Sequence, residues 1–194
     1  MALSDRLVNE VQFKCPGSTI NAIRMEVWNV LDDFCREALA WRETVSITLA
    51  PDVLTYTPIA PTGTEIVRAF TVDHPTLNIQ DATYEFDTLQ LDIAPTVEDA
   101  ASPLNLVCAL TPAIDVGSDI ENLIPVDLWS KHHRMFVKGV MALMLAQPAK
   151  PYANQPLAAF NWRAYLSDRN VAKRGAETAD IRGAQLWSFP RFGR

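Results

Sequence analysis

Few residues in this sequence have types and spacings that could support catalysis. His132 and His133 are adjacent, and neighbours on a helix point about 100° apart, so the pair is poorly placed to bind one metal ion. We expect His133 to pack in the core and His132 to lie on the surface. Asp32 and Asp33 diverge in the same way and are expected on a solvated helix face. Because no phosphate loop, nucleophile elbow or CxxC pair occurs, the sequence predicts no catalytic residue, metal ligand or cofactor, and no enzyme.

Residues 182–194, here called the tail, indicate recognition of another surface. The tail carries three arginines, one tryptophan and two phenylalanines, with no acid. Tryptophan and arginine are enriched at binding hot spots, and an extended segment can direct alternate side chains into a partner. We expect the tail to dock either on this chain's own core as a strand or on another subunit, and we favour the second. The candidate docking residues are Arg182, Leu186, Trp187, Phe189, Arg191, Phe192 and Arg194.

The composition is that of an ordinary globular protein. Of 194 residues, 48% are hydrophobic and 21% are charged, and the net charge of −6 becomes −9 when the +3 of the tail is set aside. An acidic body argues against a nucleic-acid-binding module, although contact through the arginines and aromatics of the tail is an alternative. Three widely spaced cysteines indicate a reducing compartment. The absence of a long apolar run or signal peptide predicts a soluble protein made in the cytoplasm.

Helical periodicity marks four segments. They are 3–11, 19–40, about 125–146, and a last helix that begins after Asn154. Gly139 in the third helix would allow another helix to approach closely, whereas Gly175 is expected to interrupt the last one. The buried stripe of the last helix is expected to comprise Leu157, Phe160, Ala164 and Val171.

Between the long helices the hydrophobic pattern changes to a period of two. Short strands separated by prolines are predicted at 44–49, 53–56, 65–72, 83–86, 90–93 and 104–110, with a polar loop at 96–102. This spacing is typical of a small antiparallel sheet. Since none of the helices is stable alone, they must pack against one another and bury their apolar faces. The sequence therefore predicts an α+β fold. A helical bundle (1–42 and 123–181, one early long helix and two late helices) contains an inserted β lobe (43–122) and is followed by the extended tail (182–194).

Three stretches together resemble the head-to-tail adaptor (neck or connector) proteins of tailed bacteriophages, including gatekeeper-type tail tube proteins. The first is Cys15-Pro-Gly17 and a helix closing on Asp33-Phe-Cys-Arg-Glu-Ala-Leu-Ala-Trp-Arg42. The second is Leu123-Ile-Pro-Val-Asp-Leu-Trp129 and a helix ending at Gln147-Pro148. The third is Pro151-Tyr-Ala-Asn-Gln-Pro-Leu-Ala158, a charged helix and an aromatic, basic end. The order and spacing of all three carry the resemblance. It covers most of the chain, and the β lobe is its least distinctive part.

The resemblance implies a structural virion protein of the neck or tail, made in the host cytoplasm. Such proteins form a ring, usually of twelve copies, below the portal protein, and their last segment often reaches into the portal. The tail residues would then bind portal, and the β lobe would face neighbouring copies or a downstream tail or nozzle protein. DNA would pass through the ring without sequence-specific binding, because an acidic lining repels it. Alternatives are another phage tail ring, such as a terminator or completion protein, and a small cytoplasmic enzyme.

Overall fold

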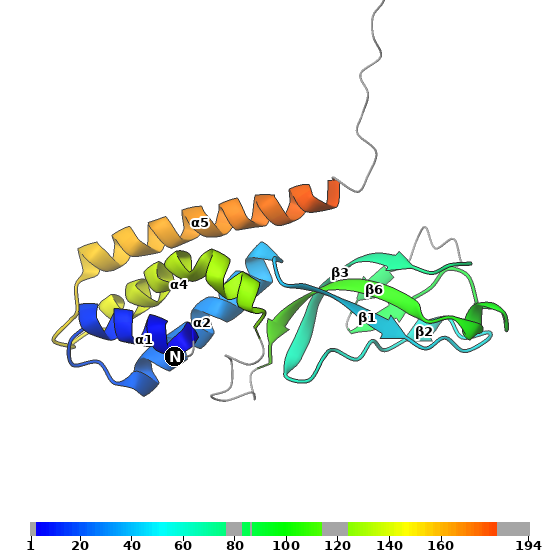
Figure 1. The fold of residues 1–194 in the computed structure, drawn as a ribbon, viewed down its shortest axis with the longest axis horizontal. Helices are drawn as coiled ribbons and strands as arrows, with labels where there is room; N and C mark the ends of the chain where they lie inside the picture. The colour runs from blue at the N-terminus through cyan, green and yellow to red at the C-terminus, as the bar shows by residue number, and fades with distance from the viewer. Residues whose placement is uncertain (1–2, 77–82, 86, 114–123, 182–194) are drawn as a thin grey trace, which may run out of the picture.

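Helices form one half of an elongated molecule and two small antiparallel sheets form the other (Figure 1). The computed structural model describes residues 3–76, 83–85, 87–113 and 124–181. Within these ranges four α-helices occur: α1 (Leu3–Lys14), α2 (Ile20–Ala38), α4 (Val126–Ala146) and α5 (Gln155–Ile181). The α+β class, with strands inserted between an early and two late long helices, is confirmed.

Helix α2 begins at a side-chain cap and ends at a residue with left-handed backbone conformation. The Thr19 hydroxyl accepts a hydrogen bond from the Ala22 amide at 3.3 Å, which satisfies one of the free donors of the first turn. At the other end Leu39 adopts a left-handed conformation with φ of 52°, and its amide donates to the Cys35 carbonyl. The helix is therefore close to the expected 19–40, shortened by one or two residues at each end.

Helix α4 is the centre of the bundle and contacts α1, α2 and α5. Its Phe136 is fully buried and meets the Phe34 ring of α2 edge to face, with centroids 5.2 Å apart. Trp129, also on α4 and buried, stacks on the Phe136 ring with centroids 5.2 Å apart. Edge-to-face rings are a favoured aromatic arrangement, so the Phe34–Phe136 contact stabilises the packing of α2 on α4.

Two three-stranded antiparallel sheets make up the lobe; the strands of the first are as long as predicted or longer, and those of the second are shorter. One has the order β1 (Arg42–Ile47), β6 (Leu104–Pro112), β3 (Thr64–Asp73), and the other β2 (Thr55–Tyr56), β5 (Thr88–Gln90), β4 (Thr83–Glu85). The expected strand 90–93 is displaced to β5. The Leu91 amide still donates to the Leu54 carbonyl at 2.8 Å, in line with the β2–β5 register, and the chain then bends into a loop. The expected loop 96–102 contains a short 3₁₀ turn, η1 (Asp99–Ala101).

The bundle and the lobe share one continuous core. Buried side chains of β6, such as Leu106, belong to the same apolar cluster as Phe34 and Phe136 of the bundle. A polar junction lies alongside: the Thr111 hydroxyl of β6 donates to Asp32 of α2 at 2.9 Å. Because α2 and β6 are in direct contact, the lobe is held against the bundle and does not hang from it by linkers alone.

Gly139 of α4 lies where α2 and α5 approach α4 closely, as its sequence position predicts. A Cβ atom at this position would lie 2.7 Å from a methyl group of Val30 and 3.0 Å from the Tyr165 ring. We expect Gly139→Ala to lower the free energy of unfolding by about 1–2 kcal/mol, because overpacking outweighs the gain in helix propensity. Chemical denaturation measures this change.

The matched control is Gly175→Ala in α5, where a Cβ atom would meet nothing within 4 Å. Here only the helix propensity changes, so the variant should gain about 0.5–1 kcal/mol. Contrary to the expected interruption, α5 continues through Gly175 to Ile181. Equal effects of the two substitutions would contradict the close packing at Gly139.

Candidate docking surfaces

All seven candidate docking residues of the tail lie outside the described residues. Their roles therefore stay predictions, and the structure bears on them only through the helix that precedes them. That helix, α5, is anchored at its start by Asn154, whose side-chain oxygen accepts from the Leu157 amide at 3.1 Å. This N-cap agrees with the expected start of the helix after Asn154, and the Gln155 amide side chain adds a 2.9 Å bond to the Ala146 carbonyl at the end of α4.

A polar cluster in the middle of α5 fixes the helix on α2. The Arg169 guanidinium donates to both carboxylate oxygens of Asp33, at 2.9 and 2.8 Å, and the Tyr165 hydroxyl donates to the same carboxylate at 2.5 Å. Tyr165 is fully buried, and burial together with the bond to Asp33 raises the pKa of its phenol far above the usual value. The expectation that Asp33 lies on a solvated face is wrong. A sequence signal exists only in the i, i+4 spacing of Tyr165 and Arg169 on one face of α5.

The apolar stripe expected to be the buried face of α5 points to solvent. Phe160 is 69% exposed, Val171 57% and Leu157 41%, while Ala164 is half-buried. The inner face instead consists of the buried Ala158, Asn161 and Tyr165, followed by the half-buried Arg169 and Ala172. The prediction was wrong because it assumed that the core face must be the more apolar one. On the other face, Tyr165 and Arg169 find hydrogen-bond partners on α2, and the Asn161 amide donates to the Leu157 carbonyl within α5.

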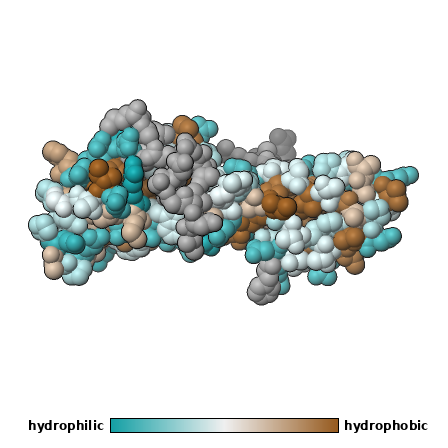
Figure 2. All heavy atoms as spheres, turned by 90° about the horizontal axis from the view of Figure 1, so that it is seen from below, coloured by the Kyte–Doolittle hydropathy of each residue, from teal (hydrophilic) through white to brown (hydrophobic). Residues whose placement is uncertain are grey.

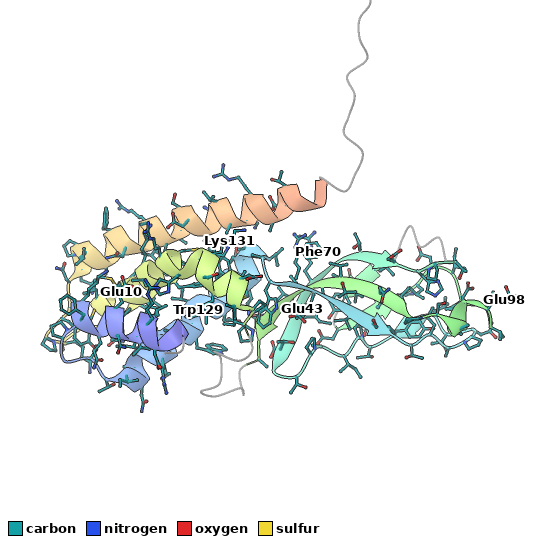
Figure 3. The ribbon with its side chains drawn as sticks, in the orientation of Figure 1. Glu10, Glu43, Phe70, Glu98, Trp129 and Lys131 are labelled. Atoms are coloured by element: carbon teal, nitrogen blue, oxygen red, sulfur yellow. The ribbon has the colours of Figure 1, made fainter. Side chains whose placement is uncertain are left out.

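A second exposed apolar surface lies at the end of the lobe farthest from the bundle. It is formed by the loops 50–54 and 91–98, here called the lobe tip, which are joined by a 3.0 Å bond from the Asp52 amide to the Pro95 carbonyl. Val97 is 76% exposed and Ile93 60%, and Glu98 marks the outer end in Figure 3. Figure 2 shows hydrophobic atoms gathered on one face of the lobe half and at its end. The lobe tip thus combines apolar side chains with acidic neighbours.

Charge is divided unequally between the two halves of the chain. The lobe segment 43–122 holds thirteen acidic residues and a single base, Arg68, and so carries −12. The bundle segments 1–42 and 123–181 together carry +3, and the tail another +3. The net acidity of the chain therefore belongs to the lobe, not to the whole body as the composition alone suggested. A basic partner would be attracted to the lobe and repelled by the bundle.

The histidines of α4 and the cysteine of α2, which are residue types that could act in catalysis, make structural contacts instead. The His132 ring lies 5.0 Å from the Phe34 ring, and burial lowers its pKa, so the expectation of a surface position is wrong. His133 is half-buried and pairs with Glu10 of α1 at 3.3 Å. Burial raises the pKa of the Cys35 thiol to about 12, so it is not a nucleophile near neutral pH. Among the described residues, no three His, Cys, Asp or Glu side chains are grouped so that they could hold a metal ion.

A small cavity on the lobe has aromatic and basic walls. It measures about 190 Å³ and lies between β3 and the sheet of β4 and β5, lined in part by Phe70, Tyr84 and Leu89. The Arg42 guanidinium sits 4.0 Å from the centre of the Phe70 ring, a cation–π contact that covers one face of that ring. Arg68 also lines this cavity.

Comparison with known proteins does not assign the chain to a family. No model of a protein family matches the chain, and a search of curated proteins found no match. Nor is any helix in the described ranges both long and apolar enough to cross a bilayer. The function must be argued from α5 and its exposed stripe, the acidic lobe and the tail.

Proposed function

We propose that this protein is a structural component of a bacteriophage neck, a head-to-tail adaptor. Identical copies form a ring in the number usual for such adaptors, twelve; the tail of each copy docks on the portal protein, and the lobes face neighbouring copies or a downstream tail or nozzle protein. The observation that best supports this proposal is the attachment of α5 to α2 through partly buried hydrogen bonds. A helix clamped to the bundle by the Asp33 cluster runs directly into an aromatic, basic segment. A rigid base lowers the entropic cost of docking an extended segment.

The charge division supports a role beside DNA. The lobe carries −12, and like charge keeps a passing duplex from binding to the wall of a channel. The three arginines of the tail are separated from these acids along the chain. A tail that grips protein and a lobe that repels DNA are compatible within one adaptor, located in the virion after synthesis in the host cytoplasm.

Another phage tail ring, such as a terminator or completion protein, fits the same surfaces. It differs in its partner, which would be a tail protein and not portal. A small enzyme is less well supported, because all three cysteines are buried and the His132 ring packs against Phe34. The docking partner of the tail therefore decides between the candidates.

Deleting residues 184–194 tests this proposal. The last described helix ends at Ile181, so the truncated chain should keep its melting temperature while losing association with portal in sedimentation. Trp187→Ala should weaken association in the same assay, and Gln185→Ala is the matched control on the same segment. Unfolding of the truncated chain would show that the tail belongs to the core, and undiminished portal binding would reject the docking role.

A further inference from the structure

We propose that copies of this chain associate through two different surfaces. The exposed apolar stripe of α5 in one copy docks against the lobe tip of the next copy. This inference rests on the proposed ring of identical copies and names the two surfaces that would form it. Each surface is apolar and exposed, and the two differ in the sign of the charges around them.

The α5 surface is an apolar stripe with basic flanks. Phe160 and Val171 lie about 120–140° around α5 from the buried Tyr165, on the solvent-facing side of the helix, and the exposed Leu157 lies at the edge of this side. Arg163 and Arg174 are exposed on the same outer side of the helix. A large aromatic ring that is 69% exposed beside further apolar side chains is costly to leave in water. The stripe therefore favours a partner that offers apolar contact with acids at its rim.

The lobe tip offers that combination. Ile93 and Val97 are more than half exposed, and Val53 and Leu54 from the neighbouring loop are exposed as well. The exposed acids of the same two loops are Asp52, Asp92 and Glu98. The loops are fixed to one another by backbone hydrogen bonds, including a 2.8 Å bond from Leu91 to Leu54, so little order has to be gained on binding.

The two surfaces cannot meet within one chain. Figure 1 shows α5 beginning at the end of the bundle opposite the lobe, and Figure 3 places Glu98 at the outer end of the lobe. A contact between different surfaces on two copies is heterologous, and repeated heterologous contacts close into a ring or extend into a filament. Opposite charge at the rims would select this pairing over contact between two stripes or two tips.

Two variants that each remove one surface test the contact. Phe160→Glu with Val171→Glu removes the stripe, and Ile93→Lys with Val97→Lys removes the tip; all four positions are exposed, so folding should be retained. The full-length wild type is expected to form species larger than a dimer in sedimentation velocity. Each variant alone should remain a monomer of 21.6 kDa, and an equimolar mixture should form a dimer of about 43 kDa, because one intact stripe then meets one intact tip.

Controls separate this contact from general stickiness. Met25→Glu on α2, 70% exposed and on neither surface, should assemble like the wild type. Raising the salt concentration from 0.05 to 0.5 M should weaken association roughly tenfold, since the rim charges are screened. A wild type that stays monomeric up to 1 mM, variants that assemble alone, or a mixture without heterodimer would each overturn the inference.

Portal binding gives an independent readout. Both double variants keep the tail, so each should still associate with portal if the proposed function holds. Loss of heterodimer formation with portal binding retained rejects this inference alone, whereas heterodimer formation without portal binding rejects the proposed function alone.

Discussion

Replacing Phe34 with alanine is expected to lower the free energy of unfolding by about 3–5 kcal/mol. The ring is fully buried where α2 crosses α4, with the Phe136 ring 5.2 Å away and the His132 ring at 5.0 Å. Truncation removes the transfer free energy of the ring and leaves a cavity that two helices joined to the lobe cannot easily close. Denaturation with urea would show a lower midpoint with an unchanged slope.

Phe13→Ala is the control for this change, because the same side chain on α1 is 87% exposed. Its removal should alter stability by no more than about 0.5 kcal/mol. A similar loss in both variants, or an unchanged midpoint for Phe34→Ala, would show that the α2–α4 contact is not the centre of the bundle.

The parts of the fold that depend on local chemistry could be predicted from the sequence. The helical period of α2 involves residues within one or two turns and is found; the structure adds the cap at Thr19. The need for a small residue at Gly139 also follows from its place on an apolar stripe. The short strands of the lobe were harder to place, because a two- or three-residue strand is defined by its partner more than by its own pattern.

The orientation of α5 could not be predicted in this way. Its inner face depends on a carboxylate 132 positions earlier in the chain, at Asp33, which satisfies the Tyr165 hydroxyl. No local pattern encodes that pairing, and the apolar stripe of Leu157 and Phe160 pointed to the opposite face. The misassigned face is informative, since an apolar stripe that the bundle does not use is available for another copy.

For the candidate docking site, too, local residue types could be predicted from the sequence but tertiary placement could not. Residue types in the tail predict a docking segment, and the described ranges end before it. What the structure adds is the helix that presents the segment and the lobe that carries the acidic charge. These depend on tertiary placement, which spacing in the sequence does not supply.

Replacing Asp33 with alanine is expected to cost about 2–4 kcal/mol. Breaking a fully buried ion pair costs about 3–5 kcal/mol, and the value is lower here because the Asp33 side chain is 33% exposed. The substitution leaves the Arg169 charge, 16% exposed, without its carboxylate and the buried Tyr165 hydroxyl without its acceptor. Exchange of α5 amide hydrogens should accelerate more than that of α4. Uniform acceleration would contradict a local anchoring role.

The same cluster predicts how stability depends on alkaline pH. The pKa of Tyr165 lies above its ordinary value of 10.0, chiefly because of burial, so the native state holds a proton that the unfolded chain releases. Its stabilising contribution is fully present below pH 10 and declines as the pH rises above that value. Tyr165→Phe should reduce this decline but not abolish it, because burial also raises the pKa of Tyr84 and Cys35 to about 12. An unchanged slope in denaturation series from pH 8 to 11 would show that the Tyr165 hydroxyl is not held as described.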